Sequence, residues 1–307
     1  MAGLLSFPLT PFTPDGGRVD LDVLATHVRQ QLAWGPGAIF IACGTGEFTA
    51  LSLAEYSDVV RVAVETVAGS VPVYAGAGGG PAIAREFAVA ATEAGADGLL
   101  LLPPYLVEAP SAGLLRHIGE IAAATDRPVI VYQRANAVLT PDSAVALLDI
   151  PNVEGIKDGR GDVELMQRIV TAVRSSGHPR ADEFRFLNGL PTAELSAQAY
   201  AGIGVRDYSS AVATFVPGIA TAFHSALDKG DQAVLDTLLA EFYLPFAALR
   251  STVPGYAVAL VKAGARQQGL ALGGVRPPLI DPTPEHEAAL AEIIRRGLAA
   301  LEEVSHD

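Results

Sequence analysis

Short apolar runs of β type alternate with alanine-rich helical segments along almost the whole chain. Eight runs are candidate strands: Leu4–Leu9, Ala38–Ala42, Val71–Ala75, Gly98–Leu102, Val129–Tyr132, Val153–Ile156, Phe184–Leu187 and Val205–Ser209. These runs are nearly continuous rather than alternating in hydrophobicity, which is typical of parallel strands covered on both faces. Helix-start signals lie between them, including the capping box from Ser52 to Glu55 and Thr140 before Pro141. The pattern predicts an α/β fold, a (β/α)₈ TIM barrel; a doubly wound open sheet is the alternative.

The chain after the eighth run contains helical patterns only. They cover residues 215–227, 232–249, 256–268 and 284–303. We expect the first to close the barrel and the other three to form a C-terminal helical extension. This predicts a barrel over residues 1–228 that carries the active site, followed by the extension over residues 229–307. No low-complexity linker divides the 307 residues.

Composition narrows the class of protein. A formal net charge of −13 leaves no basic stripe for phosphates, so we do not expect nucleic-acid binding. The single cysteine, Cys43, cannot form an intrachain disulfide and fits a reducing compartment. The first residues carry no basic segment typical of a signal peptide, and we expect no apolar run to approach the roughly 20 residues that span a bilayer. We therefore expect a cytoplasmic protein that does not interact with membranes.

Lysine is scarce enough here for its placement to be informative. The chain has three lysines: Lys229 lies in a predicted turn between helices, Lys262 in a helical pattern, and both are expected to be peripheral. Lys157 instead ends the sixth apolar run, at the strand end where TIM barrels place their chemistry. A lysine there can lose solvation and attack a carbonyl as a free amine. The alternative is a strand-end lysine that extends to solvent.

Two further strand ends carry candidate functional groups. Gly44-Thr45-Gly46 follows the second run, and its small residues would let backbone N–H groups and the Thr45 hydroxyl hold a substrate carboxylate. The alternative is an ordinary glycine-rich turn, and Glu47 is expected to fix this loop. Tyr132 ends the fifth run, next to Lys157, where a phenol can shuttle protons; a core tyrosine is the alternative.

Several other kinds of site are not supported by the sequence. The run Gly76–Gly80 fails the spacing of a nucleotide-binding loop and is expected to be a tight turn. The six histidines are scattered without a metal-binding motif, so we expect no metal site. No Gly-x-Ser-x-Gly motif supports a serine hydrolase.

Gly44-Thr45-Gly46-Glu47, Tyr132 and Gly155-Ile156-Lys157-Asp158, taken together and in this order, resemble the dihydrodipicolinate synthase / N-acetylneuraminate lyase family. These are class I, Schiff-base-forming (β/α)₈ enzymes, and the likeness extends from Leu4 to about Leu290. Within the family, the chain is most similar to the branch that dehydrates and decarboxylates 5-dehydro-4-deoxyglucarate. The segments that carry this narrower likeness are residues 3–8, 45–48, 100–106, 157–162, 189–194, 208–212, 255–258 and 275–279.

Departures from the family pattern refine this expectation. The synthase branch has a second tyrosine where this chain has Leu106, an arginine where it has Ala137-Val138, and a second threonine at Gly44. These differences argue against dihydrodipicolinate synthesis. Against the dehydratase branch, three replacements stand out: Gln133 for an asparagine, Arg160 for a threonine and Cys43 for a glycine.

The resemblance implies a role for each candidate residue. Lys157 would form the Schiff base, Tyr132 would shuttle protons, and Thr45 with Gly44 and Gly46 would hold the keto-acid carboxylate. A second carboxylate would be held by Arg134, Asn136 or Ser209. The lysine supplies the electron sink, so no cofactor is expected, and the family implies a homo-oligomer, a tetramer. The alternatives are an aldolase or dehydratase for another 2-keto-3-deoxy sugar acid, and a non-catalytic barrel that binds a keto acid.

Overall fold

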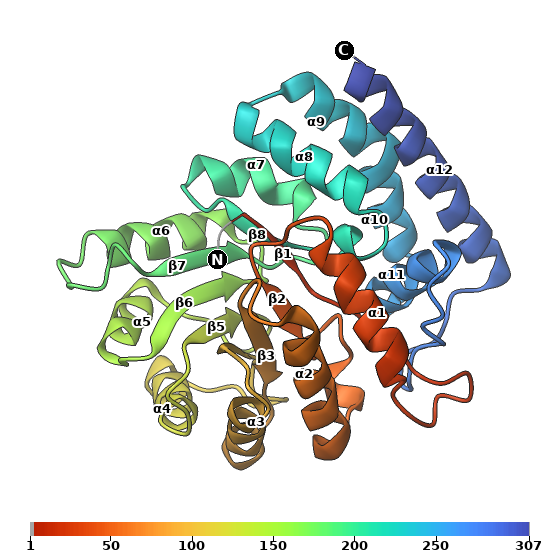
Figure 1. The fold of residues 1–307 in the computed structure, drawn as a ribbon. Helices are drawn as coiled ribbons and strands as arrows, with labels where there is room; N and C mark the ends of the chain where they lie inside the picture. The colour runs from red at the N-terminus through yellow and green to blue at the C-terminus, as the bar shows by residue number, and fades with distance from the viewer. Residues whose placement is uncertain (1–2, 307) are drawn as a thin grey trace.

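The eight apolar runs form a closed barrel of eight parallel strands in chain order, as expected for a TIM barrel (Figure 1). The computed structural model describes residues 3–306. The strands are β1 (Leu4–Ser6), β2 (Ile39–Ile41), β3 (Val73–Ala77), β4 (Gly98–Leu101), β5 (Val129–Gln133), β6 (Val153–Asp158), β7 (Arg185–Asn188) and β8 (Asp207–Ser210). Every predicted strand is therefore present, with ends that differ by a few residues.

Helices follow the strands around the outside of the barrel. They are α1 (Leu21–Leu32), α2 (Leu53–Val67), α3 (Pro81–Glu93), α4 (Ser111–Ala122), α5 (Pro141–Ala146), α6 (Val163–Arg174), α7 (Glu194–Gly202) and α8 (Pro217–Lys229). Short 3₁₀ helices η1 (Phe48–Ala50), η2 (Leu147–Asp149) and η3 (Val212–Thr214) lie in the connections. Ser52 and Thr140 cap α2 and α5 as predicted, each accepting a hydrogen bond from the backbone N–H three residues on.

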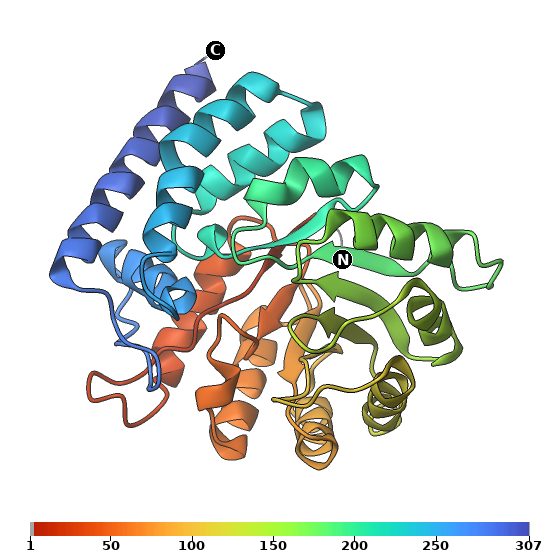
Figure 2. The same cartoon turned by 180° about the vertical axis from the view of Figure 1, so that it is seen from behind.

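The C-terminal extension contains α9 (Gln232–Leu238), a π-helical turn η4 (Leu239–Tyr243), α10 (Leu244–Arg250), α11 (Tyr256–Gln267) and α12 (Pro284–His306). The helix predicted over residues 232–249 is thus interrupted. Pro245 has no N–H to continue the α-helical pattern, and the N–H of Leu244 instead reaches the carbonyl oxygen of Leu239. Figures 1 and 2 show α9, α10 and α12 gathered beside α8 on one side of the barrel.

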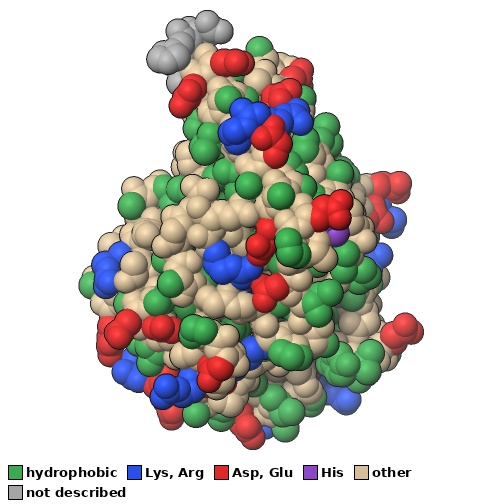
Figure 3. Space-filling view, turned by 90° about the vertical axis from the view of Figure 1, so that its right-hand side faces the viewer, with side chains coloured by type: hydrophobic (Ala, Val, Ile, Leu, Met, Phe, Trp, Pro, Cys, Tyr) green, Lys and Arg blue, Asp and Glu red, His purple; other side chains and the backbone are tan. Residues whose placement is uncertain are grey.

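One expectation about apolar length was wrong. The run Gln232–Arg250 is long and apolar enough, by length and composition alone, to cross a membrane. In this structure one face of this segment packs into the protein, where Leu238, Phe242 and Phe246 are buried in the cluster shared with α8, α11 and α12. On the face that Figure 3 presents, acidic and basic side chains are interspersed.

Aromatic side chains fill the interior of the barrel. Phe7 stacks on Phe40 with ring centroids 4.6 Å apart, and Phe40 stacks on Tyr74 at 4.9 Å. The barrel interior is therefore a packed core, and the loops that follow the strands lie over its carboxyl-terminal end.

The expected turn at Gly76–Gly80 is shorter than predicted. Gly76 and Ala77 belong to β3. A Cβ at Gly76 would lie 2.3 Å from the carbonyl oxygen of Ala42. The close approach of two backbones explains the glycine there.

Candidate active site

A cleft of about 220 Å³ opens at the carboxyl ends of the strands. Its barrel side is formed by residues in or just after seven of the eight strands, among them Thr45, Tyr132, Lys157 and Ser209. Two cationic side chains, Lys157 and Arg134, line it, whereas no acidic side chain among the described residues does so. The cleft therefore favours anions.

Lys157 and Tyr132 lie side by side in this cleft. They are register partners on the adjacent parallel strands β6 and β5, and both are buried. The Lys157 Nζ atom lies 4.0 Å from the centroid of the Tyr132 ring and 4.6 Å from that of Phe7. Within residues 3–306, no ion pair to a carboxylate involves Lys157. The amine therefore lies against two aromatic rings in the cleft, without a carboxylate partner.

The Tyr132 hydroxyl is held from two sides. It donates a hydrogen bond to the carbonyl oxygen of Gly189 at 3.1 Å and accepts one from Arg134 Nη1 at 3.3 Å. Burial raises the pKa of Tyr132, but the positive charges of Lys157 and Arg134 outweigh it, so that this pKa lies below its ordinary value. A phenol with a lowered pKa can take and return protons more readily than an isolated tyrosine.

Two glycines leave the space that this pair occupies. A Cβ at Gly189 would lie 2.6 Å from Lys157 Cγ, and one at Gly159 would lie 2.7 Å from the Tyr132 hydroxyl oxygen. Neither glycine was singled out in the sequence analysis as a positioning residue. Their position directly after strands β6 and β7 was the available signal.

Gly44 and Thr45, in the loop Gly44-Thr45-Gly46, line the cleft next to this pair. The Thr10 hydroxyl supports it by donating to the carbonyl oxygen of Gly46 at 2.7 Å. In the described structure, the backbone N–H groups of Gly44 and Thr45 and the Thr45 hydroxyl make no hydrogen bond. Three donors are therefore free beside a cationic amine, an arrangement suited to a carboxylate.

Glu47 fixes this loop, as expected for a buried carboxylate. It adopts a left-handed conformation with φ 53°, which is uncommon for a residue with a side chain. Its Oε1 accepts a hydrogen bond from Lys262 Nζ at 2.7 Å, and its Oε2 accepts one from the backbone N–H of Arg276 at 2.9 Å. The prediction that Lys262 is peripheral was wrong, because its side chain is fully buried in this ion pair.

Three departures from the dehydratase branch have structural explanations outside the cleft. Gln133 donates to Asp158 at 2.9 Å and accepts from the N–H of Leu139 at 2.8 Å, so it ties β5 to β6. Arg160 donates to the carbonyl oxygen of Ala135 at 3.1 Å. Cys43 is fully buried, which raises the pKa of its thiol to about 12. None of the three lines the cleft.

The structure separates the candidates for the second carboxylate. Arg134 and Ser209 line the cleft. Asn136 does not: it donates to the carbonyl oxygen of Pro104 at 3.0 Å and to that of Val107, and so binds the β4–α4 loop.

Gly46 is buried beneath its loop rather than at the surface of the cleft. The part of the chain that the structure describes contains no cluster of three or more His, Cys, Asp or Glu suited to a metal ion.

The C-terminal extension supplies the opposite wall of the cleft, which the sequence analysis missed. Gly255, Ala257 and Val258, at the start of α11, and Leu279 beyond it all line the cleft. The barrel prediction treated the extension as an appendage without a role in the site. Residues 255–258 and 275–279 nevertheless carry part of the family likeness, and that signal pointed to this wall.

A lysine and a tyrosine from adjacent strands, in an anion-favouring cleft at the mouth of an eight-stranded barrel, define a TIM-barrel enzyme site for a small anionic carbonyl compound. The model of the dihydrodipicolinate synthetase family matches residues 1–296, and the chain belongs to that family.

Relatives and solved structures agree with the family assignment. A protein of Streptomyces griseus named as a probable 5-dehydro-4-deoxyglucarate dehydratase is 56% identical over 99% of this chain and 94% of its own length. A protein of Streptomyces coelicolor with a corresponding name is 55% identical over 98% of this chain and 95% of its own length. The crystal structure of dihydrodipicolinate synthase from Oceanobacillus iheyensis matches with a TM-score of 0.86 and 27% identity, covering 95% of each chain.

Proposed function

We propose that the protein is a Schiff-base-forming hydro-lyase that converts 5-dehydro-4-deoxyglucarate into 2,5-dioxopentanoate, water and CO₂. The observation that carries the proposal is the pairing of Lys157 with Tyr132 in a cleft without acidic side chains among the described residues. The names of the relatives, 5-dehydro-4-deoxyglucarate dehydratases at 56% and 55% identity, support the choice of substrate.

The proposed chemistry begins at the substrate ketone. The amine of Lys157 adds to the ketone carbon, and loss of water leaves a protonated imine that withdraws electrons. Tyr132 gives its phenol proton to the oxygen that leaves as this water, and the resulting phenolate takes a proton from the neighbouring CH₂ group, giving an enamine. Tyr132 then returns that proton to the hydroxyl on the next carbon as it leaves as a second water molecule. The product of this step is an imine conjugated with a carbon–carbon double bond.

Decarboxylation follows from that conjugation. The distal carboxylate leaves as CO₂, and its bonding electrons move through the double bond into the imine. The hydroxyl-bearing carbon then becomes an enol, which takes up protons to form the aldehyde. Hydrolysis of the imine restores Lys157 and releases 2,5-dioxopentanoate, so that the whole reaction consumes one proton and needs no added oxidant or reductant.

A diacid requires two anion sites at opposite ends of the cleft. We assign the keto-acid carboxylate to the Thr45 loop, whose donors are free. Arg134 and Ser209 are the candidates for the distal carboxylate, because they line the same cleft, whereas the Asn136 side chain is engaged elsewhere. Arg134 would also supply a guanidinium group, although this chain has Ala137-Val138 where the synthase branch has an arginine.

Borohydride trapping tests the proposal. Incubation with the sugar acid and borohydride should add one ligand per chain on the peptide that carries Lys157, because Lys157 lines the cleft and forms no ion pair with a carboxylate among the described residues. Labelling of Lys262, which is buried in an ion pair, or of the exposed Lys229 would overturn the assignment. Lys157→Ala should abolish turnover and retain the fold, with Lys229→Ala as the matched control.

Product analysis separates the proposed reaction from its alternatives. A coupled aldehyde dehydrogenase should oxidise the semialdehyde product, and CO₂ should appear in equal amount. Pyruvate with a smaller aldehyde would instead identify an aldolase. Binding without an adduct or turnover would leave a keto-acid-binding barrel.

The setting of the enzyme is part of the proposal. The substrate is a small molecule, and we infer a homo-oligomer, with a tetramer as the expected size. We propose the cytoplasm as its compartment, in keeping with one buried free cysteine, and no nucleic-acid or membrane partner.

A further inference from the structure

We propose that the buried Glu47–Lys262 ion pair is a positioning device, which locks the Gly44-Thr45-Gly46 loop onto helix α11 of the C-terminal extension. The inference rests on the proposed function in one respect: this loop is taken to hold the substrate carboxylate. It adds that the geometry of carboxylate binding depends on a lysine more than two hundred positions away in the sequence.

The ion pair is unusually enclosed. The side chains of Lys262 and Glu47 are 0% and 1% exposed, and the Nζ–Oε1 distance is 2.7 Å. Removing either partner alone would leave a charge buried without compensation. Glu47 also holds a left-handed backbone conformation directly after the loop, a conformation that persists only where its surroundings fix it. The surroundings hold Glu47 through its carboxylate, which accepts hydrogen bonds from Lys262 and Arg276.

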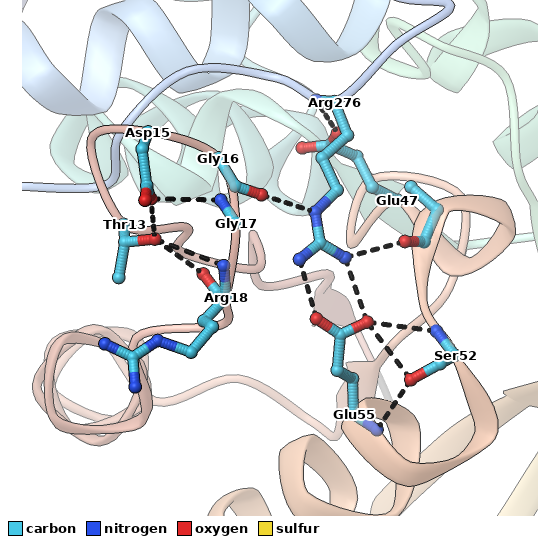
Figure 4. Close-up of polar contacts among 10 residues, drawn as sticks. Thr13, Asp15, Gly16, Gly17, Arg18, Glu47, Ser52, Glu55 and Arg276 are labelled. Carbon is cyan, nitrogen blue, oxygen red and sulfur yellow. Dashed lines mark hydrogen bonds and ion pairs between the residues drawn. The ribbon is translucent and has the colours of Figure 1, made fainter.

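A second set of contacts fixes the same carboxylate from the segment between α11 and α12. The backbone N–H of Arg276 donates to Glu47 Oε2, and its guanidinium group makes two hydrogen bonds to Glu55, at 2.6 and 2.9 Å (Figure 4). The same guanidinium group donates to the carbonyl oxygen of Gly16 at 3.0 Å. Figure 4 shows Arg276 between the β1–α1 loop and the start of α2.

Phe12 joins the two cations. The Lys262 Nζ atom and the Arg276 Cζ atom each lie 4.1 Å from the centroid of its ring, and Phe12 is 1% exposed. A cation over a buried aromatic face is attracted electrostatically, and here both cations also hold glutamates. Phe12, the two cations and the two glutamates therefore form one connected network between the barrel and the extension.

Helix α11 connects this network to the cleft. Val258 lines the cleft, and Lys262 lies four residues further along, on the same face of the helix. Leu279, three residues after Arg276, lines the cleft as well. The Thr45 loop on one wall and the α11 side chains on the other are thus held at a fixed separation by Glu47.

The consequence for the reaction is specific. Loss of the pair should move the free donors of the Thr45 loop relative to Lys157 and weaken the hold on a carboxylate. It should not change the amine itself, since Lys157 is positioned by β6, Tyr132 and Gly189. A ketone without a carboxylate should therefore be insensitive to the change.

Lys262→Met tests this with two ketones and borohydride. Pyruvate carries the carboxylate, whereas dihydroxyacetone is an uncharged ketone. The readout is the rate of trapping of pyruvate at Lys157 divided by the rate of trapping of dihydroxyacetone. We expect this ratio to fall on the order of tenfold, in line with the cost of misplaced binding groups, while trapping of dihydroxyacetone stays near that of the unaltered protein. Lys229→Met makes the same substitution at an exposed lysine and should leave the ratio unchanged.

A double variant separates positioning from stability. Lys262→Met alone leaves the Glu47 charge buried and should lower the thermal unfolding temperature. Glu47→Gln with Lys262→Met removes both charges and should restore much of that stability, because a buried ion pair contributes little net stabilisation compared with a neutral pair. The trapping ratio should nevertheless stay low, since the loop is no longer tied to α11.

The outcomes distinguish the positioning role of the ion pair from the proposed function of the enzyme. A normal ratio in the double variant, or an equal fall in trapping of both ketones, would overturn the positioning role. A low ratio in a protein that traps pyruvate but does not dehydrate the sugar acid would support the positioning role and overturn only the proposed substrate. No adduct with either ketone in the unaltered protein would overturn both.

Discussion

Glu194 is the buried carboxyl group whose ionisation we expect to govern how stability changes near neutral pH. It lies in the first turn of α7 and is 2% exposed. Its Oε1 accepts a hydrogen bond from the Ser210 hydroxyl at 2.5 Å, whereas Oε2 and the buried hydroxyls of Tyr208 and Tyr243 have no hydrogen-bond partner among the described residues. Burial raises the pKa of Glu194 from 4.5 to about 7, against the opposing effects of Ser210 and the positive charge of Arg250.

The direction of the pH effect follows from this raised pKa. In the unfolded chain the carboxyl group ionises near 4.5, while in the folded protein it keeps its proton to about 7. The free energy of unfolding is therefore unaffected by this group below 4.5, decreases as pH rises between the two values, and stays at the lower level above them. At about 1.4 kcal/mol per pKa unit, the decrease amounts to roughly 3 kcal/mol.

Glu194→Gln tests this value, because the amide is neutral at every pH and its oxygen can still accept from Ser210. Urea unfolding should give similar stabilities for variant and unaltered protein near pH 5. Near pH 8 the variant should be the more stable by about 3 kcal/mol. Glu93→Gln, which removes an exposed carboxyl group on α3, is the control. A difference that does not change with pH, or a variant that is less stable near pH 8, would show that Arg250 compensates the ionised carboxylate.

Two further substitutions test the catalytic pair. Tyr132→Phe should lower kcat on the order of 10²–10⁴, the range for a general acid–base group, and a near-normal kcat would make Tyr132 a packing residue. Gly189→Ala should slow both turnover and borohydride trapping, because its Cβ would lie 2.6 Å from Lys157 Cγ and 2.8 Å from Cε. Gly202→Ala, whose Cβ meets nothing within 4 Å, is the control, and unchanged trapping in Gly189→Ala would contradict the steric argument.

The barrel could be predicted from the sequence because its strands are buried on both faces. Continuous apolar runs such as Val129–Tyr132 and Gly98–Leu102 leave few other folds, and the capping residues Ser52 and Thr140 mark where helices begin. Lys157 and Tyr132 could be brought together for the same reason, since parallel strands adjacent in the chain order place their carboxyl ends side by side. Strand ends were less certain, as the extension of β3 through Gly76 shows.

Contacts between the barrel and the extension could not be predicted in the same way. They join residues far apart in the sequence, and helical periodicity does not specify which strand-end loop a helix meets. Lys262 had one usable signal: it lies within Tyr256–Ala265, a stretch apolar on nearly all sides, which is typical of a buried helix. A charge in such a helix needs a buried partner, and Glu47 after the Thr45 loop is that partner.

The two cations of the cleft have separate tasks in the proposed reaction. Lys157 must present a neutral amine to the ketone, whereas holding a diacid requires positive charge. Arg134 resolves this conflict, because a guanidinium group keeps its charge under all conditions in proteins. Burial raises the pKa of Tyr132, whereas the positive charges of Lys157 and Arg134 lower it, and the charge of Arg134 remains when Lys157 presents a neutral amine. We therefore expect Arg134 to keep the cleft positive throughout the reaction, although the chain as a whole carries a net charge of −13.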